Sequence, residues 1–109
     1  MNTRDSIPVC PHGTREDLDF YLVALCDFLG QFGNLKLEFT SGYRCQACNE
    51  KAGGAADSAH LRGKAVDIVP MSPEQRYDIL GVAFLRGINR IGITKDHIHL
   101  DVDASLPQG

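Results

Sequence analysis

The chain has 109 residues, of which 43% are hydrophobic, enough for one small domain with its own core. The formal net charge is −3 and no cluster of Lys and Arg occurs along the sequence, which argues against nucleic acid as the main partner. No apolar stretch approaches the ~20 residues of a membrane span, and we expect a monomer.

The first third of the chain is predicted to form a lead-in followed by an amphipathic helix. Residues 1–12 contain two prolines and no periodicity, so we expect them to be extended. Thr14 and Asp17 resemble a capping box, and apolar residues then recur at three- and four-residue steps, which predicts a helix over about residues 15–32. The apolar residues of its predicted buried face are Leu18, Tyr21, Leu22, Leu25, Phe28, Leu29 and Phe32.

A strand and a short helix are expected next. Gly33-Asn34 should end the long helix. The apolar residues Leu35, Leu37 and Phe39 alternate with polar ones, which is typical of a half-buried strand. Residues 46–52 are compatible with a short helix, and residues 53–57 form a glycine-rich loop.

The second half of the chain predicts one more helix among three strands. Residues 64–69 are expected to form a strand that Pro70 ends. Ser72-Pro73 is a strong helix start, and this helix should run to Gly87. Its predicted apolar face consists of Tyr77, Leu80, Phe84 and Leu85. Strands near 90–93 and 98–102 follow, joined by residues 94–96. The order of elements predicts an α+β fold with a small, mainly antiparallel sheet.

Four cysteines leave several interpretations open. Cys26 lies in the apolar helical pattern and is expected to be a buried hydrophobe. Cys45 and Cys48 form a CxxC pattern, which could be a redox pair, half of a zinc site or a coincidence on a helical turn. Cys10 and His12 could add ligands for a second, structural zinc, but we favour the simpler expectation that Cys10 contacts Cys45 or Cys48.

Metal-capable residues gather in two short runs, residues 58–67 and 96–99. His60, Asp67 and His99 together offer two imidazoles and one carboxylate. Such a set suits Zn²⁺ and leaves a fourth position for water, and a further carboxylate beside that water could act as its base.

The last predicted strand separates polar from apolar side chains. His97, His99 and Asp101 alternate with apolar residues, so the two kinds should point to opposite faces. With the apolar face in the core, the polar residues lie on the other side. The alternative is that they are merely solvent-facing residues of an edge strand.

The two runs also resemble motifs of a known enzyme class. The pattern Ser-x-His-x-x-Gly-x-Ala-x-Asp spans Ser58 to Asp67, and residues 96–99 give the later acid-x-x-His. Upstream, Thr40-Ser41-Gly42-Tyr43-Arg44, then Asn49 and Gly53-Gly54, is similar to the stretch ahead of the first ligand. Over residues 38–102 the chain resembles the M15 zinc D,D-carboxypeptidases and L-alanyl-D-glutamate endopeptidases. That class includes vancomycin-resistance dipeptidases and phage endolysins, and shares its fold with the hedgehog signalling domain.

The resemblance assigns roles to individual residues. It implies a single hedgehog/DD-peptidase-like domain over residues 1–109, with one Zn²⁺ per chain held by His60, Asp67 and His99. It implies that Asp96 is the general base and acid, and that His97 lies behind the ligands or donates in the transition state.

Two further residues are implied to bind substrate. Arg44 matches an arginine that holds substrate or the developing oxyanion, and Ser58 is placed to support the substrate or the ligands. The alternatives are a surface salt bridge for Arg44 and a turn hydroxyl for Ser58.

The resemblance therefore implies a zinc metallopeptidase that hydrolyses an amide bond of a peptidoglycan stem peptide. Residues 1–5 lack the apolar core of a signal peptide, so we expect synthesis in the bacterial cytoplasm. Action at the cell wall would then follow release, as for an endolysin, or export. The alternative is a non-catalytic, metal-stabilised binding module or a virion-structural module on the same fold. A structural site needs no base and usually closes its fourth position with protein, so Asp96 favours the enzyme.

Overall fold

The computed structural model describes residues 3–32, 37–54, 58–88 and 90–103, and it is built on one four-stranded antiparallel sheet. The strands lie in the order β1-β2-β4-β3. Their bounds are β1 Glu38–Ser41, β2 Ala65–Val69, β3 Arg90–Ile93 and β4 Ile98–Asp101. The predicted α+β class with a small antiparallel sheet is confirmed.

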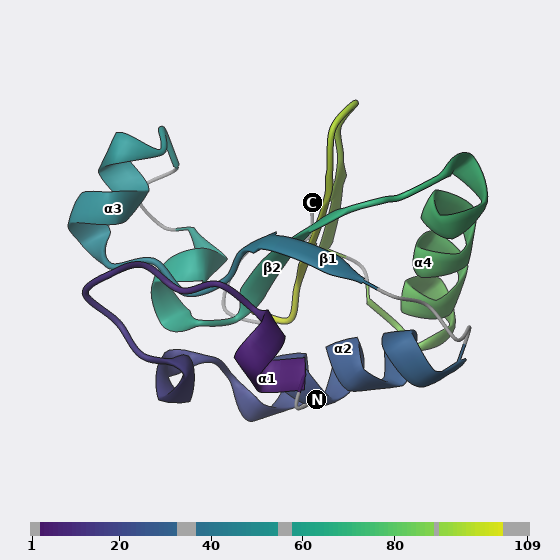
Figure 1. Ribbon diagram of the computed structural model, residues 1–109, viewed down its shortest axis with the longest axis horizontal. Helices are drawn as coiled ribbons and strands as arrows, with labels where there is room; N and C mark the ends of the chain where they lie inside the picture. Colours follow the sequence, from purple (N-terminus) through teal and green to yellow (C-terminus); the bar gives the residue numbers. More distant parts are fainter. Residues whose placement is uncertain (1–2, 33–36, 55–57, 89, 104–109) are drawn as a thin grey trace.

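Helices flank the sheet below and at both ends (Figure 1). The α-helices are α1 Thr3–Ser6, α2 Phe20–Phe32, α3 Gln46–Lys51 and α4 Pro73–Leu85, and two short 3₁₀ helices are η1 Arg15–Asp17 and η2 Ala59–Arg62. In Figure 1, α1 and α2 lie beneath the sheet, while α3 and α4 stand at opposite ends. None of the helices within the described ranges has the length and apolarity needed to cross a membrane.

The core lies between α2, α4 and one face of the sheet. Alternate residues of the two central strands point into it: Val66, Ile68, Ile98 and Leu100 are all fully buried. This alternation directs the side chains between them to the opposite face of the sheet. The predicted separation of apolar and polar residues along β4 is therefore confirmed, and the polar face is left open for a site.

Helix α2 is shorter than the helix that the apolar pattern predicted over residues 15–32. Arg15–Asp17 is a 3₁₀ turn, and the α-helix begins only at Phe20. Asp19 causes the break, because its carboxylate accepts the Leu22 N–H at 3.1 Å as a helix cap. The Asp19 N–H donates instead to the Gly63 carbonyl at 2.7 Å. Tyr21 (51% exposed) and Phe28 (36%) were wrongly placed on the buried face, while the Phe32 side chain lies outside the described part.

The lead-in is also not wholly extended, as residues Thr3–Ser6 form α1. Arg4 stabilises this turn, since its guanidinium donates to the carbonyls of Arg15 and Leu18. A helix of four residues is too short to show a periodic pattern of apolar residues, so the sequence did not predict α1.

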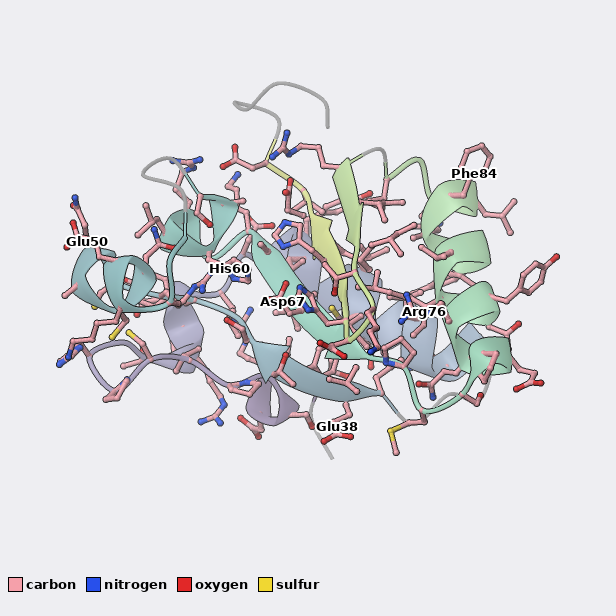
Figure 2. All side chains as sticks on the ribbon, turned by 90° about the horizontal axis from the view of Figure 1, so that it is seen from above. Glu38, Glu50, His60, Asp67, Arg76 and Phe84 are labelled. Carbon is pink, nitrogen blue, oxygen red and sulfur yellow. The ribbon has the colours of Figure 1, made fainter. Side chains whose placement is uncertain are left out.

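The apolar face predicted for α4 was wrong for three of its four residues. Tyr77, Phe84 and Leu85 are 78%, 78% and 76% exposed, and Figure 2 shows Phe84 at the outer edge of the molecule. The buried residues are instead Ile79, Val82 and Ala83. Its start is as predicted, with the Ser72 Oγ accepting the Gln75 N–H at 3.0 Å.

The remaining expected elements are present, although β1 begins at Glu38, after the described residue Leu37 of the predicted alternation. α3 fills most of residues 46–52, and both C-terminal strands are present. Phe39 of β1 and Leu37 just before the strand pack against the core. The expectations for Gly33-Asn34, Leu35 and residues 55–57 fall outside the described residues.

Candidate metal centre

Strand register brings two of the predicted ligands face to face. Asp67 on β2 is the direct partner of His99 on β4, so both side chains rise from the open face of the sheet. On the other side of His99, its partner on β3 is Gly92. A Cβ at Gly92 would lie 3.3 Å from that of His99, so glycine leaves room beside the imidazole.

The third predicted ligand, His60, comes from the short helix η2. Ser58 caps this helix, with its Oγ accepting the His60 N–H at 3.2 Å. Gly63 ends it at φ 67°, a conformation that favours glycine. A Cβ at Gly63 would also approach the Asp17 carbonyl oxygen to 1.8 Å. This tight turn returns the chain into β2 and holds His60 beside Asp67.

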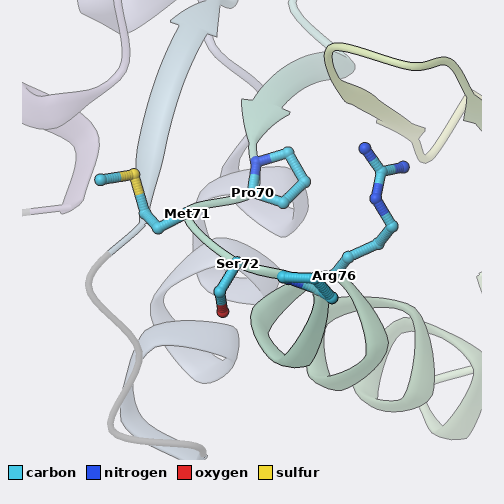
Figure 3. A pocket seen from close by; sticks show the side chains of 5 residues that line it. Pro70, Met71, Ser72 and Arg76 are labelled. Carbon is cyan, nitrogen blue, oxygen red and sulfur yellow. The ribbon is translucent and has the colours of Figure 1, made fainter.

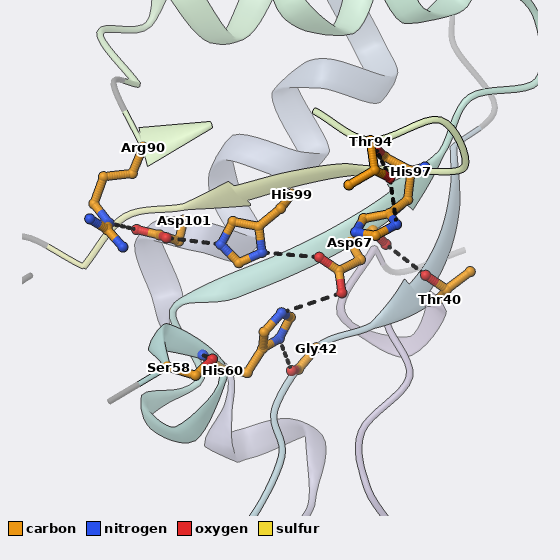
Figure 4. Close-up of polar contacts among 10 residues, drawn as sticks. All are labelled: Thr40, Gly42, Ser58, His60, Asp67, Arg90, Thr94, His97, His99 and Asp101. Atoms are coloured by element: carbon orange, nitrogen blue, oxygen red, sulfur yellow. Dashed lines mark hydrogen bonds and ion pairs between the residues drawn. The ribbon is translucent and has the colours of Figure 1, made fainter. Parts of the chain in front are cut away.

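The three side chains converge on one point (Figure 4). Asp67 lies between the imidazoles, with Oδ2 3.4 Å from His60 Nε2 and Oδ1 3.0 Å from His99 Nδ1. The two rings are 5.2 Å apart at an interplanar angle of 68°. One ligand atom from each residue lies within 4.8 Å of the others. His60 is 2% exposed, whereas the side chains of Asp67 and His99 are partly open to solvent at 16% and 27%.

Each imidazole is held through its other nitrogen. His60 Nδ1 lies 2.6 Å from the Gly42 carbonyl oxygen, which can only accept, so Nδ1 carries a proton and Nε2 faces Asp67. His99 Nε2 lies 2.9 Å from Asp101 Oδ2, which leaves Nδ1 for the site. Arg90 in turn donates to Asp101 Oδ1 at 2.6 Å. Metal-binding histidines are characteristically oriented by a carbonyl or a carboxylate in this way.

The charges of the cluster fit a bound cation. Burial alone would raise the pKa of Asp67, but hydrogen bonds and charge from His60 and His99 outweigh burial and hold this pKa well below its usual range. Burial alone would lower the pKa of His99, but hydrogen bonds to Asp67 and Asp101 outweigh it and raise the pKa. Without a metal, His99 thus tends to hold a proton on the nitrogen that faces Asp67. A divalent ion can replace that proton, so the donor set fits Zn²⁺ bound by two nitrogens and one oxygen.

A comparison with known families agrees with this geometry. The family model described as Peptidase M15 matches residues 8–101. The chain belongs to the Peptidase M15 family. No curated protein matches the sequence. Family membership indicates a peptidase of the metal-dependent kind, and the match covers all three residues of the cluster.

In this M15 chain, Asp96 is not one of the residues whose ligand atoms gather in the cluster. It is exposed in the turn between β3 and β4, where its N–H donates to the Thr94 hydroxyl at 3.3 Å. His97 follows it, half-buried, with Nδ1 3.0 Å from the same hydroxyl. Arg76 of α4 fixes the turn by donating to the carbonyls of Thr94 and Lys95, both at 3.1 Å.

Arg76 also borders a pocket at the start of α4. Its other lining residues are Pro70, Met71, Ser72 and Pro73 (Figure 3). Figure 2 shows the Arg76 side chain reaching from α4 toward the strands. Because its guanidinium is already bonded to the turn, Arg76 serves to position the loop that carries Asp96.

Arg44 and Ser58 have different surroundings. The Arg44 N–H donates to the His60 carbonyl at 3.0 Å, which places Arg44 beside the M15 motif. Its Nε is buried and has no hydrogen-bond partner among the described residues, and no ion pair of Arg44 occurs in those ranges. Nothing in the described ranges therefore supports the alternative interpretation of Arg44 as part of a surface salt bridge. Ser58, by contrast, acts as the turn hydroxyl that the alternative interpretation expected.

Two participants were not identified from the sequence. The Gly42 carbonyl orients His60, and a backbone oxygen has no signature beyond the motif that contains it. Asp101 orients His99, and its place on the polar face of β4 was visible in the alternation. The alternation did not show that Asp101 is buried, with only 3% of it exposed, or that it pairs with Arg90.

Proposed function

We propose that this protein is a zinc-dependent peptidase that hydrolyses an amide bond of a peptidoglycan stem peptide. The observation that carries the proposal is the convergence of His60, Asp67 and His99 on one point, with both imidazoles held by outer partners. The cluster is partly open to solvent, as a reacting centre requires. Membership of the M15 family supports the peptidase activity.

Zinc held by His60, Asp67 and His99 would supply a Lewis acid and lower the pKa of water to about 7. The protein's own part in the reaction is proton transfer and positioning. Asp96 accepts the proton of the attacking water and later returns it to the leaving amine. Asp96 lies in the β3–β4 turn that Arg76 fixes, and His97 is the next candidate for the same role.

Arg44 is proposed to bind the substrate carbonyl or the oxyanion that develops from it. Its guanidinium is not committed to an ion pair within the described part of the chain, and its backbone is tied to His60. An oxyanion donor of this kind contributes ~3–4 kcal/mol to transition-state binding. Ser58 is proposed to act on substrate only indirectly, through the turn that presents His60.

The stem-peptide substrate is proposed from the resemblance of residues 38–102 to cell-wall D,D-carboxypeptidases and L,D-endopeptidases. With this substrate, the protein acts at the cell wall, reached by release or by export.

Digestion of purified peptidoglycan tests the proposal. Soluble peptides and new amino groups should appear with the zinc-loaded protein, disappear with a chelator and return with zinc. Identification of the released peptides shows which bond is cut. If the loaded protein binds peptidoglycan but releases nothing, the binding-module alternative replaces the enzyme.

A further inference from the structure

A second group of metal-capable side chains shares no residue with the site already described. It joins Cys10 and His12 of the lead-in to Cys45 and Cys48 at the start of α3. One ligand atom from each of the four residues lies within 4.8 Å of the others. His12 Nδ1 is 3.5 Å from the Cys45 sulfur and 3.4 Å from the Cys48 sulfur. All four cysteines of the chain are free thiols, so no disulfide occupies this cluster.

The spacing fits tetrahedral zinc. With Zn–S near 2.3 Å and Zn–N near 2.05 Å, tetrahedral angles place sulfur and nitrogen ligands about 3.6 Å apart. The two sulfur–nitrogen distances at His12 are within a few tenths of an ångström of that edge. We infer that Cys10, His12, Cys45 and Cys48 form a second, structural zinc site. Three sulfurs and one nitrogen fill all four positions, so this site leaves no place for a substrate or a reactive water.

The backbone around the cluster supports the same inference. The Cys45 N–H donates to the Cys10 sulfur at 3.3 Å, a contact that stabilises a thiolate ligand. The Gly13 N–H donates to the Cys10 carbonyl at 3.0 Å, closing a tight turn that carries both Cys10 and His12. The expected contact between Cys10 and Cys45 is thus confirmed, as one edge of a four-ligand group.

The location gives this zinc a structural task. The Cys10 N–H donates to the Tyr43 carbonyl at 3.1 Å, and the neighbouring Arg44 N–H donates to the His60 carbonyl at 3.0 Å. The second zinc therefore ties the lead-in to the segment that holds His60. Because metal binding free energy is also folding free energy, it stabilises a small domain at the edge where α3 stands apart (Figure 1).

Metal content and thiol reactivity of the wild-type protein test the inference. Zinc-loaded protein should contain two zinc ions per chain and show no thiol that reacts quickly with a disulfide reagent. After chelation, three thiols should react. Cys26 should remain protected until unfolding, because it is 1% exposed and burial raises the pKa of its thiol to about 12. Substitution of cobalt should produce sulfur-to-metal charge-transfer absorption.

Variants separate the two sites. Cys48→Ser should lose one zinc and most of the cobalt–sulfur absorption, whereas the matched control Cys26→Ser keeps both. His99→Ala should lose one zinc but keep the cobalt–sulfur absorption. The second zinc site can therefore be tested independently of the proposed peptidase site. If the Cys48 variant does not fold, the wild-type measurements decide. Equal thiol reactivity with and without zinc, no cobalt–sulfur absorption, or a Cys45–Cys48 disulfide in the zinc-loaded protein would each overturn the inference.

Discussion

Replacing Asp101 with asparagine should weaken metal binding although Asp101 is not a ligand. Its two carboxylate oxygens accept from opposite sides, one from Arg90 at 2.6 Å and one from His99 at 2.9 Å. An amide has one oxygen and one NH₂ group, so it can accept on one side only. If the oxygen stays with Arg90, the NH₂ group faces His99 Nε2. That nitrogen must then accept, and the imidazole proton moves to Nδ1, the atom that faces Asp67.

The size of the effect follows from the role of Asp101 behind a ligand. Loss of such an outer partner typically lowers metal affinity ~10–100-fold, or about 1.4–2.7 kcal/mol. The metal-free protein should also lose stability, because Arg90 is left beside a neutral group. A fully buried pair broken in this way costs ~3–5 kcal/mol. The Arg90 side chain is 20% exposed, so we expect a loss below that range.

Asp103→Asn is the matched control for Asp101→Asn. Asp103 is 2% exposed and pairs with Arg62, so the same substitution there removes a buried charge without removing the partner of a candidate ligand. Competition with a chromophoric chelator, after the cysteine cluster has been loaded, measures affinity at the histidine site. Urea unfolding with chelator present measures stability. If the two variants bind metal equally tightly, the argument from the His99 proton is refuted.

Four further outcomes are expected. Asp96→Asn should keep its zinc and melting temperature but lose ~10²–10⁴ in turnover; loss of zinc would instead make Asp96 a ligand. His99→Ala should lose metal at this site, so adding zinc in calorimetry should raise its melting temperature less than that of the wild type. In metal-free protein, the pKa of His99 is raised in the folded state, so its protonation stabilises the fold at pH values below ~6.5. This stabilisation is lost as the pH rises through the pKa that His99 has in the folded protein. The urea midpoint of wild type should thus fall toward alkaline pH more than that of His99→Gln. Arg76→Ala should lower turnover at unchanged zinc content, because it frees the Asp96 turn; an unchanged rate would show that the turn is fixed without it.

The sheet could be predicted because its signal is local and repeated. Along β4, apolar residues alternate with polar ones, and strand geometry alone sends them to opposite faces. The register that pairs Asp67 with His99 could not be predicted in this way. It depends on how distant strands pair, which no short window of sequence contains.

Helix faces were harder to predict, and α4 shows the reason. It carries apolar residues on more than one side, so three-residue and four-residue steps can be drawn through several sets. The large residues Tyr77 and Phe84 suggested one face, but packing selected Ile79, Val82 and the small Ala83. These three residues belong to the same core cluster as residues of α2 and the sheet, so the bulk of a side chain is a poor guide to its burial here.

Two clusters of ligands now meet at one backbone segment, residues 42–44. The Gly42 carbonyl fixes the His60 ring, the Tyr43 carbonyl accepts from Cys10, and the Arg44 N–H donates to the His60 carbonyl. Ordering the backbone of one residue costs ~1–2 kcal/mol, so a metal that orders this segment from the cysteine side removes part of that cost for a metal at His60. Such coupling is necessarily reciprocal. The inferred structural zinc and the proposed catalytic zinc should therefore strengthen each other's binding without sharing a ligand.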